Sequence, residues 1–221
     1  MNPILKRTLT GLAVAAVVIL AVLFAPVGWF RPVAGVLFLA AVWEYETLLA
    51  RKCCPMSFAF LAFLIVGVVV LFGGLLYAIP AIAERYGNVM LLYILAIVKF
   101  SDTGGFAFGV TSSKLMKCGN HKLCPTISPG KSWEGLLGSV VFSVAVSCAF
   151  VPLTKFGVPK ALAFGLVAAL VGTAGDLVES KFKRWVGVKD SSTMKITNGM
   201  GGFLDMVDSL LFAPGVLLPF I

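Results

Sequence analysis

The chain has 221 residues, of which 59% carry apolar side chains and only 13% are charged, and its mean hydropathy is +1.00. A soluble domain is nearer half apolar and a quarter charged, so this chain cannot cover its surface with polar groups and lipid must be its solvent. The net charge of +8 lies in short loops between apolar runs. That distribution excludes a nucleic-acid partner and indicates membrane orientation and contact with anionic lipid or nucleotide phosphate.

Seven apolar runs follow one another along the chain, and a transmembrane helix needs roughly 20 residues. They cover residues 8–27, 32–50, 56–83, 88–108, 133–153, 160–179 and 200–220. The first follows Lys6 and Arg7 without a convincing cleavage site, so we interpret it as a retained span. The third fits one tilted helix or a helix broken at Gly73-Gly74. The sequence therefore predicts an all-α integral membrane protein of about seven transmembrane helices, forming a single domain over residues 1–221.

Basic residues are divided unevenly between the predicted loops. If the N-terminus is cytoplasmic, thirteen of the 18 bases fall in inside segments and four fall outside. The positive-inside rule expects this asymmetry. Two inside segments are long, over residues 109–132 and 181–199. We therefore expect a protein of the inner (plasma) membrane, with these segments and a polar cavity facing the cytoplasm.

Four carboxylates lie in or beside the last two apolar runs. Asp176 and Glu179 end the sixth run, while Asp205 and Asp208 lie inside the seventh. A carboxylate in a membrane segment is costly, and the spacing of three places each pair on one helical face. Carboxylates that converge on one cavity repel each other unless cations intervene, and Mg²⁺ prefers such oxygen ligands. The alternative is a structural polar pair, with each aspartate bonded to Lys99 or to a neighbouring serine.

Two basic segments accompany these carboxylates. Residues 129–132, Pro-Gly-Lys-Ser, directly precede an apolar helix, which places N–H groups, a lysine and a hydroxyl where anions bind. They are not a P-loop, because a glycine is missing and no strand is expected before them. Residues 180–190 carry Lys183, Arg184 and Lys189, which suit a polyphosphate beside metal-binding carboxylates. The alternatives are a solvated loop for the first segment and a lipid-surface anchor for the second.

The order of these motifs resembles the signature of the phosphatidate cytidylyltransferases, the CDP-diacylglycerol synthases. The residues that carry the resemblance are Ser180, Lys183-Arg184, Lys189-Asp190, Gly201-Gly202 and Asp205-x-x-Asp208, with Asp102-Thr103-Gly104-Gly105, His121-Lys122-Leu123 and residues 128–135 upstream. The resemblance covers about residues 95–215, the expected catalytic region, and leaves the N-terminal helices over residues 1–90 unmatched except in hydropathy. Met200 and Met206 stand where the family has histidine and arginine. A catalytically dead relative is therefore one alternative.

The resemblance implies that CTP and phosphatidate react to CDP-diacylglycerol and pyrophosphate with Mg²⁺, and it leaves room for a second cation. It implies catalytic roles for Asp176, Asp205, Asp208 and Lys183. It implies metal ligation by Asp176, Ser180, Asp205 and Asp208. It implies substrate contacts by Asp102, Lys122, Ser128, Lys131, Arg184, Lys189 and Asp190.

Three further points complete these expectations. A fourth helix that is short or broken at Gly104-Gly105 would open the cavity sideways to a lipid headgroup. The same reaction on an isoprenyl ether phosphate and a transporter with midplane carboxylates are the competing functions. Lipid-chain preference and a homodimer are left open.

Overall fold

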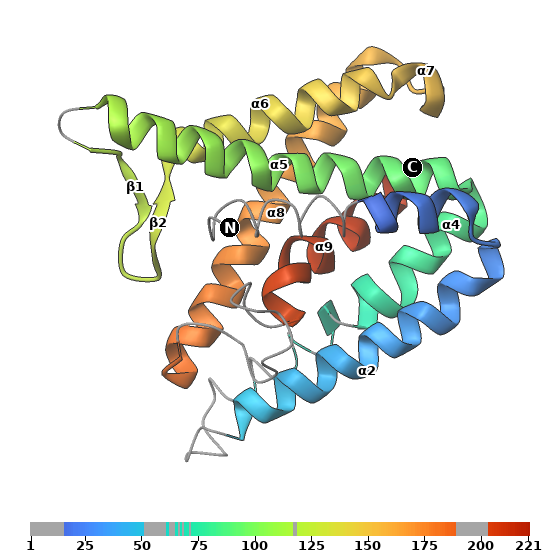
Figure 1. Ribbon diagram of the computed structural model, residues 1–221, viewed down its shortest axis with the longest axis horizontal. Helices are drawn as coiled ribbons and strands as arrows, with labels where there is room; N and C mark the ends of the chain where they lie inside the picture. Colours follow the sequence, from blue (N-terminus) through green and yellow to red (C-terminus); the bar gives the residue numbers. More distant parts are fainter. Residues whose placement is uncertain are drawn as a thin grey trace, which may run out of the picture.

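A computed structural model describes residues 16–50, 61, 65, 67, 69–70, 72–116, 119–188 and 203–221. A helix over residues 16–24 and the 3-10 turn η1 (Val27–Trp29) lead into α2 (Phe30–Leu49). The π-helix η2 (Phe72–Ala78), α4 (Ile79–Tyr86) and α5 (Asn88–Leu115) follow. A hairpin of β1 (Lys122–Cys124) and β2 (Ser128–Ser132) precedes α6 (Trp133–Ala149), α7 (Val151–Thr154), α8 (Val158–Val186), α9 (Phe203–Leu217) and η4 (Leu218–Phe220) (Figure 1).

The central helices pack in the order α5, α6, α8 and α9, with α5 lying along α6 (Figure 1). A chain of buried hydroxyls ties the first three together. Ser147 Oγ donates to the carbonyl oxygen of Ala161 at 2.6 Å, so the Tyr93 hydroxyl donates to Ser147 Oγ at 2.7 Å. Apolar side chains of α5, including the fully buried Ile94 and Ile97, fill the core around this chain. The site-bearing helices therefore form one packed unit.

Helix α6 buries its small polar residues and exposes its apolar ones. The buried hydroxyls recur at every fourth position, at Ser139, Ser143 and Ser147. On the opposite side Leu137 and Val141 are 60% and 45% exposed. A soluble helix shows the reverse, whereas in lipid small residues mediate helix packing and apolar side chains face outward. The burial pattern thus agrees with lipid as the solvent.

Among the residues that the structure describes, three helices are long and apolar enough to cross a membrane, namely Val27–Leu49, Asn88–Leu115 and Val158–Val186. Trp133–Ala149 and Ser209–Phe220 are shorter apolar helices. The predicted helical membrane protein is confirmed, and within the described ranges the β1–β2 hairpin is its one departure from an all-α fold. The count of seven spans stays a prediction, because parts of the first and third predicted runs lie outside those ranges.

Two helices run further than the sequence predicted. Helix α5 continues unbroken through Gly104-Gly105 to Leu115, so residues 109–115 of the predicted first loop are helical. Helix α8 continues to Val186 and ends where Gly187 adopts a left-handed conformation with φ 88°, a common helix C-terminus. Helical glycine costs about 1 kcal/mol, and packing against a neighbouring helix can outweigh that cost. The predicted break at Gly104-Gly105 was therefore wrong.

The third apolar run changes helix type at the Gly73-Gly74 pair but is not broken there. The π-helix η2 contains the Gly73-Gly74 pair, and α4 begins directly after it. A Cβ added at Gly74 would collide with the carbonyl oxygen of Leu211 in α9. Glycine at this position lets the backbones of η2 and α9 touch.

Candidate active site

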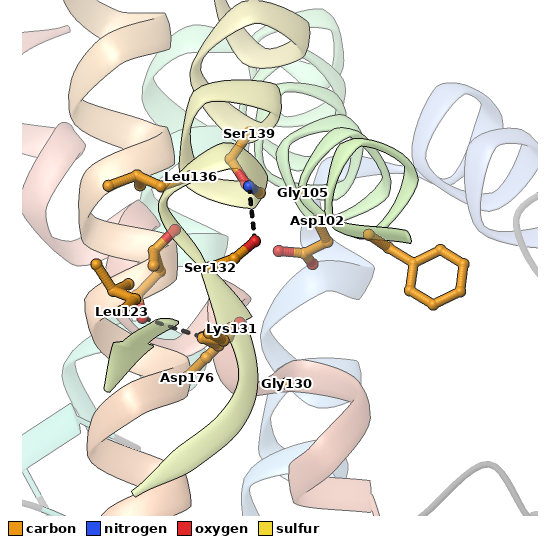
Figure 2. A pocket seen from close by; sticks show the side chains of 13 residues that line it. Asp102, Gly105, Leu123, Gly130, Lys131, Ser132, Leu136, Ser139 and Asp176 are labelled. Atoms are coloured by element: carbon orange, nitrogen blue, oxygen red, sulfur yellow. Dashed lines mark hydrogen bonds and ion pairs between the residues drawn. The ribbon is translucent and has the colours of Figure 1, made fainter. Parts of the chain in front are cut away.

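A pocket of about 250 Å³ lies where α5, the hairpin, α6 and α8 meet (Figure 2). Its charged groups come from three segments that are distant in sequence, with Asp102 on α5, Lys131 on β2 and Asp176 on α8. Figure 2 shows Asp102 on one side of the pocket and Asp176 with Lys131 on the other. The remaining lining residues are Gly105, Phe106, Gly109, Leu123, Gly130, Ser132, Gly135, Leu136, Ser139 and Thr173.

Glycines bring α5 and α6 into contact along one wall of the pocket. A Cβ at Gly104 would lie 2.5 Å from the carbonyl oxygen of Gly138, and a Cβ at Gly138 would lie equally close to that of Gly104. One turn further, a Cβ at Gly135 would lie 3.0 Å from the carbonyl oxygen of Gly105. Small residues at matching turns of two helices are the usual signal for such close packing in membranes. The Gly104-Gly105 pair is this signal in the sequence, although by itself it also suggests a helix break.

Lys131 reaches from the hairpin to α8. Its Nζ donates to Asp176 Oδ2 at 2.8 Å and to the carbonyl oxygen of Thr173 at 3.2 Å. The Lys131 and Asp176 side chains are 23% and 24% exposed. A charge-assisted hydrogen bond that is largely shielded from solvent is stronger than one on the surface. The ion pair therefore holds the hairpin against α8 and keeps a lysine ammonium inside the pocket.

Asp102 is held by two residues that the sequence did not assign to the site. Its Oδ2 accepts hydrogen bonds from Ser209 Oγ at 2.8 Å and from Lys99 Nζ at 3.3 Å. The sequence analysis considered Lys99 or a serine as hydrogen-bond partners of the aspartates in α8 and α9. The structure shows a lysine and a serine bonded to Asp102 of α5 instead. A lone base within a span and a serine directly after Asp208 were the available signals.

The end of the hairpin forms the start of α6. Ser132 is the N-cap, since its Oγ accepts from the Gly135 backbone N–H at 3.1 Å. Beside it, the His121 ring nitrogen Nδ1 lies 2.7 Å from Glu134 Oε1 in the first turn of α6. The expectation that no strand precedes residues 129–132 was wrong, because β1 precedes them and β2 contains them. The missing glycine still excludes a P-loop.

The structure thus brings three predicted site residues together at one pocket: Asp102, Lys131 and Asp176. Lys122 and Ser128 lie on the same hairpin, but neither lines the pocket as the structure describes it.

Further predicted residues lie along α8. Ser180 and Lys183 follow Asp176 by one and two turns, about 6 and 10 Å along the helix axis. Lys183 Nζ donates to Glu179 Oε2 at 3.1 Å, and both side chains are nearly buried. Arg184 donates to the carbonyl oxygen of Val188 at 3.1 Å. Among the described residues, the pocket lining includes none of the side chains of Glu179, Ser180, Lys183 and Arg184.

The structure describes the side chains of only some of the predicted metal ligands. Asp205 and Asp208 lie in the first two turns of α9, but their side chains, like Lys189 and Asp190, are outside the described part of the chain. Within that part, no three His, Cys, Asp or Glu side chains form a metal-binding group. Asp102 and Asp176 nevertheless offer hard oxygen donors to one pocket, and these suit Mg²⁺. The residues present therefore fit the ion as part of its ligand set.

The fold and the pocket define a helical membrane protein with a charged, lysine- and carboxylate-lined site. A sequence model of the cytidylyltransferase family matches residues 56–221, well over half of the chain. The chain therefore belongs to the cytidylyltransferase family.

Three relatives show how far the similarity extends. The chain is 44% identical over 124 residues to the phosphatidate cytidylyltransferase of Staphylococcus aureus (strain COL), which covers 55% of this chain and 45% of the relative. It is 36% identical over 158 residues to that of Staphylococcus saprophyticus, covering 71% and 57%. It is 37% identical over 147 residues to the uncharacterized protein YnbB of Escherichia coli (strain K12), covering 66% and 47%. The chain spans about half the length of the curated relatives it matches.

Proposed function

We propose that this chain transfers a cytidylyl group from CTP to phosphatidate, giving CDP-diacylglycerol and pyrophosphate. The observation that carries the proposal is the pocket in which Asp102, Lys131 and Asp176 converge from three segments. Membership of the cytidylyltransferase family supports the reaction class. Two relatives named phosphatidate cytidylyltransferase support phosphatidate as the acceptor.

In this reaction a phosphate oxygen of the lipid attacks the α-phosphorus of CTP. The bond from that phosphorus to the bridging oxygen breaks, and pyrophosphate leaves with the electron pair. Lys131 is the one cation that lines the pocket among the described residues. Its ammonium has three donors and two are used on α8, so one remains for a triphosphate oxygen. The N-terminus of α6 adds a positive partial charge at the same wall.

Mg²⁺, when bound, would neutralise charge that grows on the leaving pyrophosphate. We assign Asp176, Ser180, Asp205 and Asp208 to hold it, because they lie on α8 and on the first turns of α9. Asp102 would contact the nucleoside or a second cation. Lys183, Arg184, Lys189 and Asp190 would extend the phosphate-binding region beyond the pocket, and Lys122 and Ser128 would border it on the hairpin.

The lipid would reach the pocket beside Phe106. This side chain lines the pocket and is 75% exposed, so it marks the mouth on the outer side of α5. A lateral route from the leaflet is therefore compatible with an unbroken α5. The excess of basic residues in the predicted inside segments supports an inner-membrane location with the pocket facing the cytoplasm.

The proposal is tested by following two labels of CTP. Purified protein in lipid nanodiscs receives CTP labelled at the α- or the γ-phosphate, together with phosphatidate, an isoprenyl ether phosphate or no added lipid. We expect α-label in the organic phase with phosphatidate only, and γ-label in aqueous pyrophosphate. Transfer to the isoprenyl lipid alone would reassign the acceptor. Label moved across sealed vesicles without CTP cleavage would support a transporter instead.

A further inference from the structure

Ser209 of α9 stands between two charged groups of α5. The residue has no exposed surface, and its hydroxyl donates to Asp102 Oδ2 at 2.8 Å and accepts from Lys99 Nζ at 3.2 Å. Lys99 Nζ also lies 3.3 Å from Asp102 Oδ2, so the three polar atoms form a closed triangle. Ser209 is shielded from water, so its hydroxyl depends on protein partners, whereas the Lys99 and Asp102 side chains are 43% and 35% exposed.

The same serine lies where α9 also meets α8. A Cβ at Gly172 would be in ordinary contact with Ser209 Cβ, at 3.8 Å. One turn further along α8, a Cβ at Gly175 would lie 2.6 Å from the Phe212 ring. Gly175 thus lets α9 pack closely against α8 immediately before Asp176, whereas a methyl group at Gly172 would fit. Ser209 is therefore at the junction of the helices that carry Asp102, Asp176 and the Asp205–Asp208 pair.

We propose that Ser209 is a positioning residue of the cytidylyl-transfer site. Its bond to Asp102 fixes the first turns of α9, which carry Asp205 and Asp208, at one distance from α5 and α8. The inference rests on the proposed function, because it is the carboxylates of that site that Ser209 aligns. Hydrogen-bond partners of ligating side chains typically contribute 10- to 100-fold to metal affinity or activity. A serine that only filled space would contribute to stability and not to cation affinity.

The test compares Ser209→Ala with a matched control, Ser147→Ala. Ser147 is equally buried and also makes two hydrogen bonds, but its partners are Tyr93 and the Ala161 carbonyl oxygen, and neither is a carboxylate of the site. Three quantities are measured for each purified variant: the unfolding temperature, the Mg²⁺ concentration at half-maximal rate, and Mn²⁺ affinity by electron paramagnetic resonance without substrates. Ser209→Thr, which keeps the hydroxyl, is the conservative variant.

We expect both alanine variants to unfold at lower temperature. Only Ser209→Ala should need roughly 10- to 100-fold more Mg²⁺ and bind Mn²⁺ correspondingly more weakly, with Ser209→Thr restoring most of the loss. Equal Mn²⁺ affinity in the two alanine variants would overturn the proposal. If Ser209→Ala does not fold, Ser209→Cys, which fills the space but is only a weak donor to Asp102, should also weaken Mn²⁺ binding. An unchanged Mn²⁺ affinity in that variant would equally contradict the proposal. A wild type that binds Mn²⁺ but never labels lipid would refute the proposed function instead.

Discussion

At the residue scale, the pocket pairs each of its carboxylates with a lysine from another position in the chain. Asp176 is bonded to Lys131 and Asp102 to Lys99. These four groups carry no net charge together, so they offer little attraction to a triphosphate by themselves. We therefore expect bound Mg²⁺ to supply much of the attraction for the triphosphate. The individual contribution of each lysine can then be measured by substitution.

Replacing Lys131 by methionine should weaken the use of CTP. The variant loses the ammonium proposed to contact the triphosphate, and a hydrogen bond to a charged group contributes about 1.5–3 kcal/mol, or roughly 10- to 100-fold. We expect kcat/KM for CTP to fall by that factor. Lys114→Met is the control, because Lys114 is exposed at the end of α5 and outside the pocket. Equal losses in the two variants would contradict the assigned contact.

Met200 and Met206 stand where the resembled signature has histidine and arginine, and this difference predicts that the rate depends steeply on the magnesium concentration. Methionine is a weak acceptor and no donor, so it cannot replace the histidine or arginine of the resembled signature. The carboxylates of α9 must then depend more on cations. We expect Met206→Arg to lower the Mg²⁺ concentration at half-maximal rate, measured as rate against Mg²⁺ for both proteins. A revertant that needs the same or more Mg²⁺ would show that the arginine has no such role here.

At the scale of helices and strands, the sequence predicted the order of apolar helices. The family resemblance placed Asp102, Lys131 and Asp176, which line one pocket, among a larger set of site residues. The prediction from sequence failed where contacts between distant segments determine the local structure. The Gly104-Gly105 pair is a break signal when read locally, yet its partner is Gly138, which lies 34 residues away. The hairpin was missed because its first strand has only three residues. Asp102 was assigned from its motif, whereas Lys99 and Ser209, 110 residues apart, needed the fold to bring them together.

The contact between α5 and α6 makes a prediction for glycine substitutions. A methyl group at Gly104 would lie 2.5 Å from the Gly138 carbonyl oxygen, so Gly104→Ala should destabilise the protein by about 1–3 kcal/mol. Gly35 is also helical but has nothing within 4 Å of an added Cβ. Gly35→Ala should therefore leave the unfolding temperature unchanged or raise it slightly. Thermal unfolding of both variants in the same detergent is the measurement, and an equal response would contradict the close packing.

At the scale of the whole molecule, the hairpin and α7 lie at opposite ends of α6 (Figure 1). Helix α6 has 17 residues and is therefore about 25 Å long, close to the thickness of the hydrocarbon core. The pocket belongs to the hairpin end, where Lys122 and Lys131 of the predicted inside segments lie. The two ends of α6 should consequently face different compartments.

Cysteine labelling in sealed cells tests this orientation. A variant that keeps Cys124 of β1 as its single cysteine should resist an impermeant maleimide until the membrane is permeabilised. A cysteine-free background with Lys155→Cys should react at once, because Lys155 is exposed beyond the other end of α6. Rapid labelling of Cys124 from outside would place the pocket on the wrong side for cytosolic CTP.

The central claim is that one pocket, built around Asp176, carries out cytidylyl transfer. The most direct measurement is the transfer of α-phosphate label from CTP to phosphatidate by wild type and Asp176→Asn, with equal unfolding temperatures confirming that both are folded. Asparagine keeps the size of the side chain and removes its charge. We predict labelled lipid from wild type and a rate lower by well over tenfold, or ~1.4 kcal/mol, in the variant. Near-normal transfer by Asp176→Asn, or no labelled lipid from folded wild type at any Mg²⁺ concentration, would contradict the claim.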